Sequence, residues 1–174
     1  IASLMEKQRP DITFEIVESR GNWAAILSSV RQKLGYEDRP LRNVTVTPNQ
    51  TDMTGVYTRA KILLVLSLWW ESLPRVAIEA ALNGIPIIGT NRGGIPEAVG
   101  DDSVLHTFNE NIYQPPYNRL PDSTEIEELG RKVISLYEKH PHPKPAEKRI
   151  AQKFSLEKMS FEIHKNFTRL LTAN

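Results

Sequence analysis

Residues 60–99 constrain the fold more than any other stretch, because short apolar runs alternate there with loops and a helical pattern. Residues 62–66 form an unbroken aliphatic run, too short for a free-standing helix and typical of a parallel strand covered on both faces. Ile87 and Ile88 form a second such run. The pattern therefore predicts two buried parallel strands joined by a helix.

The connecting helix is expected to run from Pro74 to Gly84. Proline is tolerated in the first turn, where its missing N–H costs nothing, and a glycine commonly follows the last turn. Most residues of this segment are apolar, whereas Arg75 and Glu79 lie four positions apart on one polar stripe. Extended backward, that stripe points towards Glu71.

The loops that follow the two strands are expected to line one crevice. Ligands of open α/β sheets bind beyond the carboxyl ends of the strands, where Glu71 and the loop 89–94 would lie. Helices start directly after both loops, at Pro74 and Pro96. Because free N–H groups and the helix dipole favour an anion there, the sequence predicts a ligand that carries phosphate.

The rest of the chain alternates between strand and helix patterns. Residues 107–123, rich in proline and asparagine, indicate a loop or connector, either a lid or a linker. Such alternation predicts a Rossmann-like, doubly wound parallel sheet with helices on both faces. Further strands are predicted at 12–17, 44–47 and 103–106, and further helices at 23–34, 124–137, 145–153 and 155–171.

Composition excludes several classes of function. The 174 residues, 40% of them hydrophobic, are enough for one domain with a real core. With 22 Lys and Arg against 21 Asp and Glu, no strong field favours nucleic acid. The chain has no cysteine and no apolar run of membrane-spanning length. We therefore expect no nucleic-acid partner, no transmembrane segment and a cytoplasmic location.

The residues around the crevice resemble a known family. Residues 71–79, ESLPRVAIE, resemble the E-x7-E signature of retaining glycosyltransferases of group 1 (family 4). Residues 79–86, EAALNGIP, resemble the continuation E-A-x-x-x-G-x-P, and residues 93–97, GGIPE, resemble the G-G-x-P-E loop. The resemblance implies that residues 1–174 are the C-terminal, donor-binding half of a two-domain GT-B enzyme, without the Gly-rich first strand and loop.

The resemblance implies a hexosyltransferase whose donor substrate is a nucleotide diphosphate sugar, with a glycan, lipid or small molecule as acceptor and no cofactor. It assigns Glu71 to the donor sugar as the catalytic residue and Glu79 to the ribose. A carboxylate suits both tasks, because it accepts two hydrogen bonds from neighbouring hydroxyls. Other residues assigned to substrate binding are Ser72, Leu73, Arg75, Arg92, Gly93, Gly94, Thr47 and Pro48.

On a straight helix eight residues span about 12 Å, so two carboxylates at this spacing could hold opposite ends of one ligand. Metal is not expected, because the chain lacks the Asp-x-Asp motif of the other glycosyltransferase fold. It also lacks G-x-G-x-x-G and a Walker lysine loop. The site is therefore expected to work with protein groups alone.

A partner domain is also implied. The helix at 155–172 has one apolar face, and in the family resembled this helix crosses to the N-terminal acceptor domain. We therefore expect this chain alone to be inactive, and the whole enzyme to reach the inner face of the membrane, if at all, through that domain. In the strand order 3-2-1-4-5-6 the absent first strand would lie between the strands at 12–17 and 62–66.

Simpler interpretations stay open for single residues. Arg75 and Glu79 could form an exposed ion pair worth about 0.3–0.5 kcal/mol, and Glu71 could be a solvated loop residue. Trp69 and Trp70 could wall a sugar pocket, cover the sheet edge or contact another domain. The alternative functions are a non-catalytic nucleotide-sugar binding module and a GT-B-type sugar-nucleotide epimerase.

Overall fold

The computed structural model describes residues 1–18, 23–35, 39–117, 119–140 and 148–172. All strands in this part of the chain are parallel, and they form a two-stranded sheet in the order β1-β2 and a three-stranded sheet in the order β3-β4-β5. The strands are β1 (Phe14–Val17), β2 (Val44–Thr47), β3 (Leu63–Val65), β4 (Ile87–Thr90) and β5 (Val104–His106).

The helices alternate with the strands as predicted, and most bounds agree within a few residues. Residues 145–147 of the helix expected at 145–153 lie outside the described part of the chain. The helices are α1 (Ala2–Gln8), α2 (Trp23–Leu34), α3 (Thr54–Arg59), α4 (Arg75–Leu82), α5 (Ile95–Ala98), the 3-10 helix η1 (Glu110–Tyr113), α6 (Ser123–Lys139), α7 (Lys148–Lys153) and α8 (Leu156–Thr172).

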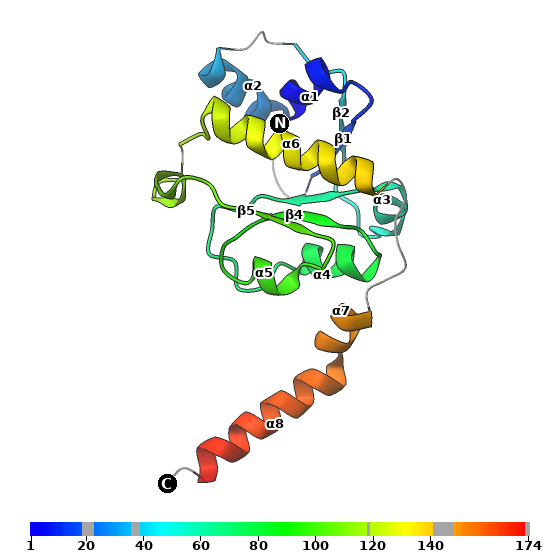
Figure 1. Ribbon diagram of the computed structural model, residues 1–174, viewed down its shortest axis with the longest axis vertical. Helices are drawn as coiled ribbons and strands as arrows, with labels where there is room; N and C mark the ends of the chain where they lie inside the picture. The colour runs from blue at the N-terminus through cyan, green and yellow to red at the C-terminus, as the bar shows by residue number, and fades with distance from the viewer. Residues whose placement is uncertain (19–22, 36–38, 118, 141–147, 173–174) are drawn as a thin grey trace.

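The three-stranded sheet lies between two helical layers, with α6 on one face and α4 and α5 on the other (Figure 1). Every residue of β4 is buried. Ile87 packs into the apolar cluster that contains α4 and α5, whereas Ile88 packs into the cluster that contains α6. Because successive strand side chains point to opposite faces, this confirms the prediction of parallel strands covered on both sides.

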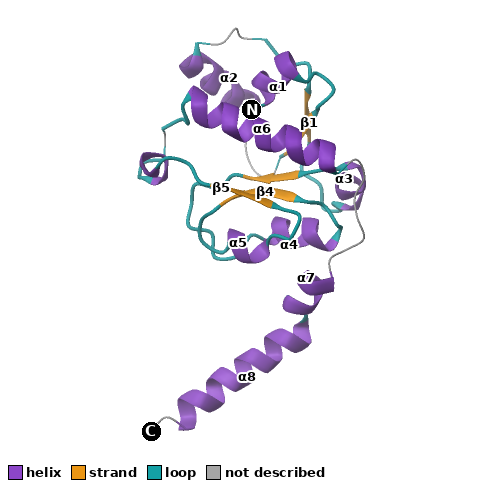
Figure 2. Cartoon of the chain, viewed as in Figure 1, coloured by secondary structure: helices purple, strands orange, loops and turns teal. Residues whose placement is uncertain are grey.

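The predicted sheet is interrupted between β1 and β3. The observed neighbours, β1 with β2 and β4 with β3 and β5, are those that the expected strand order requires. However, no pairing joins β1 to β3 in the described residues, and Figure 2 shows β1 apart from the layer that contains β4 and β5. The break falls where that order places the absent first strand.

Helix α4 has the expected ends with a shift of one residue. It begins at Arg75, and Pro74 is its N-cap rather than part of its first turn. At the other end Gly84 adopts a φ of 70°, which a glycine reaches without steric cost. The N–H of Ile85 then donates to the carbonyl of Ala80 at 2.9 Å and closes the last turn. Gly84 is thus confirmed as the helix stop.

The connector at 107–123 is packed against the sheet rather than free. Ile112 and Tyr113, both in η1, are buried in the cluster under α6. The N–H of Phe108 donates to the Tyr113 hydroxyl at 2.9 Å. Asp122 and Glu125 form a capping box at the start of α6, so the connector ends in a fixed position. The part of the connector around η1 is therefore ordered by packing, and its role as a lid or a linker stays a prediction.

Helix α8 extends away from the rest of the molecule (Figure 1). Its predicted apolar face is exposed in the structure, although the side chain of Leu170 lies outside the description. No helix among the described residues is long and apolar enough to cross a membrane. The exposed apolar side chains are Leu156, Met159, Phe161, Ile163 and Phe167.

Candidate functional site

Glu71 lies at the carboxyl end of β3, as predicted. Ser67 follows that strand, and its hydroxyl donates to Glu71 Oε1 at 3.0 Å. The N–H of Gly94 donates to the Glu71 carbonyl at 2.6 Å. The first bond holds the carboxylate of this half-buried residue and the second holds its backbone, so the interpretation of Glu71 as a freely solvated loop residue is wrong.

The loop after β4 packs against the Glu71 loop through two glycines. A Cβ built on Gly94 would overlap the Ser72 carbonyl oxygen, and one built on Gly93 would overlap the Glu71 carbonyl oxygen. Gly93 also has a φ of 56°, in the left-handed region that favours glycine. Glycines are therefore required here, because only they allow the two loops to form one continuous wall.

Glu79 is held by a tyrosine from another helix. The hydroxyl of Tyr57, in α3, donates to Glu79 Oε2 at 2.7 Å. Burial raises the pKa of Tyr57, and the hydrogen bond to Glu79 raises it further, so the phenol stays a donor. No ion pair joins Arg75 to Glu79 among the described residues, which excludes the surface-pair interpretation.

The two glutamates do not share one helix. Glu79 lies in α4, but this helix begins only at Arg75, and Glu71 lies in the preceding loop. The helical span of about 12 Å expected for eight residues therefore does not apply to this pair. Their relative position is set instead by Ser67, Gly94 and Tyr57.

Aromatic side chains lie beside Glu71. Trp69 and Trp70 are 63% and 73% exposed, so they do not cover the sheet edge. The rings of Trp69 and Tyr117 lie 4.5 Å apart. The guanidinium of Arg92 lies 4.5 Å from the Tyr113 ring centre and 5.3 Å from the Trp70 ring centre. Arg92, in the loop after β4, therefore lies against aromatic rings from the Glu71 loop and from η1.

The remaining predicted residues divide into two groups. Ser72, Leu73 and Arg75 are exposed at the start of α4, next to Glu71 in sequence. Thr47 and Pro48, in contrast, follow β2 of the other sheet, and Thr47 Oγ1 donates to Glu15 at 2.5 Å. No hydrogen bond or ring contact found in the described residues connects Thr47 or Pro48 to the Glu71 loop. Their role in binding stays a prediction.

Two residues that support the site were missed in the sequence. Tyr57 carries no local signal, because its hydroxyl meets Glu79 from 22 positions away. Thr90 is fully buried at the end of β4, and its hydroxyl donates to the Ser67 carbonyl at 2.8 Å. A polar residue at the carboxyl end of a buried strand is a signal that sequence reasoning could have used for Thr90.

His106 ends β5 opposite Thr90 and is fully buried. Lys132 Nζ lies 3.0 Å from its Nδ1. Burial, and then the charge of Lys132, lower the pKa of His106, so the ring is neutral and Nδ1 accepts from the ammonium. No group of three metal-binding side chains occurs among the described residues.

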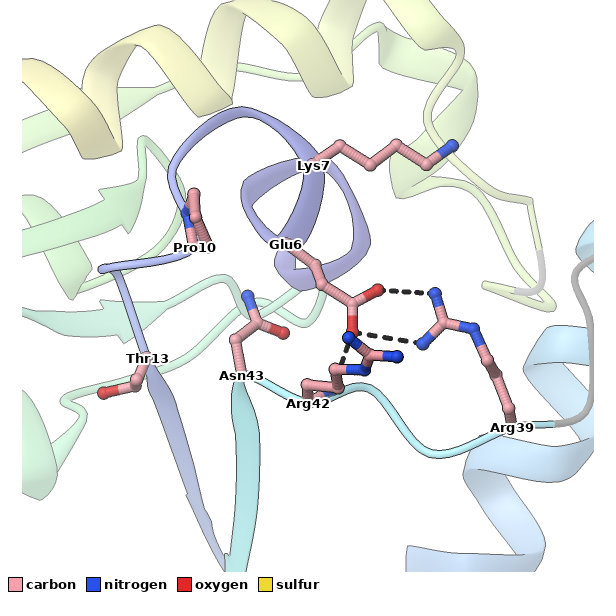
Figure 3. Close-up of a pocket in the computed structure, with 7 residues that line it drawn as sticks. All are labelled: Glu6, Lys7, Pro10, Thr13, Arg39, Arg42 and Asn43. Carbon is pink, nitrogen blue, oxygen red and sulfur yellow. Dashed lines mark hydrogen bonds and ion pairs between the residues drawn. The ribbon is translucent and has the colours of Figure 1, made fainter.

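A separate pocket of about 410 Å³ lies between α1 and the segment before β2 (Figure 3). Glu6 accepts from Arg39 Nη2 at 2.8 Å and from the Arg42 N–H at 2.7 Å, contacts that lower the pKa of Glu6 to about 2. Glu6 and Arg39 are thus paired with each other, and none of the predicted site residues lines the pocket. The lining residues are Glu6, Lys7, Pro10, Thr13, Arg39, Arg42 and Asn43.

Residues 1–154 match the profile of the family described as "Glycosyl transferases group 1". The chain belongs to this family. Within it, the chain is 38% identical over 85 residues to spore coat protein SA of Bacillus subtilis (strain 168). That match covers 46% of this chain and 22% of the relative.

The fold of the chain is similar to that of solved glycosyltransferase structures. The chain superposes on HepE from Anabaena in complex with UDP-glucose with a TM-score of 0.63 and 19% identity, over 97% of this chain and 44% of HepE. It superposes on the pneumococcal O-GlcNAc transferase GtfA in complex with UDP and GlcNAc with a TM-score of 0.64 and 17% identity, over 99% of this chain and 32% of GtfA. The fold is therefore the Rossmann-like architecture of GT-B glycosyltransferases, and the chain spans less than half the length of each relative.

Proposed function

We propose that the chain is the donor-binding domain of a retaining glycosyltransferase that transfers a hexose from a nucleotide diphosphate sugar to a glycan, lipid or small molecule. The observation that carries this proposal is the pair of fixed carboxylates, Glu71 held by Ser67 and Glu79 held by Tyr57, on the wall completed by Gly94. UDP-sugars are the first donors to test, because HepE and GtfA are solved with UDP-glucose and with UDP and GlcNAc.

In this proposal each carboxylate has one task. Glu79 accepts from the ribose hydroxyls through Oε1, because Oε2 is engaged by Tyr57. Glu71 accepts from the donor sugar and favours positive charge at the anomeric carbon as the leaving group departs. The diphosphate lies between them near the exposed start of α4, where Leu73 and Arg75 supply amides and Pro74 has none.

A second domain supplies the other wall of the cleft. The apolar face of α8 is exposed over Leu156, Met159 and Phe167, and a partner domain would cover it. Closure of two domains excludes water and completes a site, so the isolated chain lacks half of the proposed machinery. We therefore propose an N-terminal acceptor domain as the partner of residues 155–172.

The test is calorimetric titration of the full-length protein and of the 174-residue chain with UDP, UDP-glucose and UDP-GlcNAc. We expect the full-length protein to bind a nucleotide diphosphate sugar and to transfer its sugar with the anomeric configuration retained. The isolated chain should bind more weakly and transfer nothing. Failure of the full-length protein to bind any such donor contradicts the proposal, and acceptor-free epimerisation of the donor would favour the epimerase.

Tyr57→Phe tests whether the tyrosine hydroxyl orients Glu79. The variant keeps the buried ring and removes one hydrogen bond to a carboxylate, so the affinity for UDP should fall about fivefold with the melting temperature nearly unchanged. Tyr137→Phe is the control, because that hydroxyl contacts Lys61 instead. Wild-type UDP affinity in Tyr57→Phe would show that the hydroxyl does not orient Glu79.

A further inference from the structure

Arg92 is a cation at the candidate site whose guanidinium meets no polar partner in the part of the chain that the structure describes. Among the described residues it forms no ion pair and no side-chain hydrogen bond, and its Nε is buried without an acceptor. Neither of its Nη groups is among the buried atoms that have no hydrogen-bond partner. A buried donor without an acceptor is destabilising, which favours a ligand that offers negatively charged oxygens to this guanidinium.

The surroundings of Arg92 hold its side chain in place without neutralising it. The rings of Tyr113 and Trp70 lie 4.5 and 5.3 Å from the guanidinium carbon, within the range of cation–π attraction. Glu71, an acid of the same wall, accepts from Ser67 and forms no ion pair with Arg92 in the described part of the chain. A guanidinium that keeps its charge and its paired N–H edge is suited to bidentate binding of a carboxylate or phosphate.

Arg92 lies beside a surface on which a sugar ring can stack. Arg92 immediately precedes the two glycines, and Gly94 donates to the Glu71 carbonyl at 2.6 Å. Trp70, which contacts Arg92 and directly precedes Glu71, is 73% exposed and offers an apolar surface against which a pyranose ring can stack. A ligand that touches both Trp70 and Arg92 therefore combines a sugar ring with an anionic group.

We propose that Trp70, Arg92 and Tyr113 form a subsite for a sugar substrate that bears an anionic group, a carboxylate or a phosphate ester. This proposal rests on the proposed function, because it places the anionic sugar beside Glu71. The subsite selects charged sugars over neutral ones through the guanidinium, and the aromatic rings hold that guanidinium in place. It is distinct from the binding of the nucleotide diphosphate, which is assigned to Glu79 and the start of α4.

The test compares glucose, glucuronate and glucose 6-phosphate as ligands of the full-length protein, by ligand-observed NMR titration with and without saturating UDP. We expect both anionic sugars to bind at least about tenfold more tightly than glucose. Hydrogen bonds between charged groups typically raise affinity by this factor or more. Arg92→Gln should reduce that preference to less than about twofold and should lower the affinity for UDP by much less than the affinity for the anionic sugars. Arg131→Gln, which removes an exposed arginine of α6, should keep the preference.

Each other result overturns the proposal. Equal affinity of wild type for all three sugars, or a preference that persists in Arg92→Gln, excludes an anion subsite at Arg92. A loss of UDP affinity in Arg92→Gln that equals the loss for the anionic sugars would assign Arg92 to the donor diphosphate instead. If wild type binds no UDP, the proposed function fails, whereas the titrations without UDP still decide whether Arg92 selects anionic sugars. The tighter of the two anionic probes identifies phosphate or carboxylate as the preferred group.

Discussion

Glu71→Gln in the full-length protein is expected to lower kcat/KM for sugar transfer by about 100-fold or more and to leave the affinity for free UDP within about twofold of wild type. Glutamine keeps the size of the side chain and can still accept from Ser67 Oγ, but it removes the negative charge. That charge matters most when positive charge develops at the anomeric carbon, so its loss appears in the transition state rather than in ground-state binding.

Glu79→Gln, in contrast, should weaken the binding of the nucleotide itself. Its proposed ribose contact is present in free nucleotide and in donor alike, so both affinities should fall about tenfold or more. Calorimetric titration with UDP, beside transfer kinetics, separates the two glutamates, with Glu127→Gln on the exposed face of α6 as the control. If Glu71→Gln abolishes UDP binding and Glu79→Gln does not, the assigned roles are reversed.

Gly94→Ala is expected to lower the free energy of unfolding by about 3 kcal/mol, because its Cβ would overlap backbone rather than a movable side chain. The overlapping atom is the Ser72 carbonyl oxygen, and moving the loops apart would break the bond of 2.6 Å from the Gly94 N–H to Glu71. The backbone of Gly94 itself is unstrained, with a φ of −84°, so the whole effect comes from the contact between the loops.

Thermal and urea unfolding measure this effect, together with UDP affinity, which should fall as the Glu71 loop shifts. Gly55→Ala is the matched control, because a Cβ at Gly55 in α3 would meet only Arg59 Nη1 at an ordinary 3.5 Å. Alanine is also a better helix former than glycine, so the control should be as stable as wild type or more stable. Equal stability of the two variants would contradict the role given to Gly94.

Local patterns in the sequence predicted most of the secondary structure. The apolar run at 62–66 and the pair Ile87 and Ile88 became β3 and β4, and the polar stripe with Gly84 became α4. A strand buried on both faces has a continuous apolar run, and a helix covered on one face has a periodic apolar stripe. Both patterns can be recognised within a short stretch of sequence. The position of Glu71 at the end of β3 followed from the same reasoning.

The contacts that make the site depended on tertiary structure. Tyr57 meets Glu79 across 22 positions, Gly94 meets Glu71, and Arg92 lies against Tyr113, and none of these pairs has a periodic signal. The break between β1 and β3, in contrast, falls where the strand order expected from the sequence placed it. The amino-acid sequence by itself thus determined the order of the elements and the family motif, because these depend on neighbours along the chain. Tertiary structure decided which hydroxyl orients each carboxylate and which aromatic rings surround Arg92, because those contacts join residues that only folding brings together.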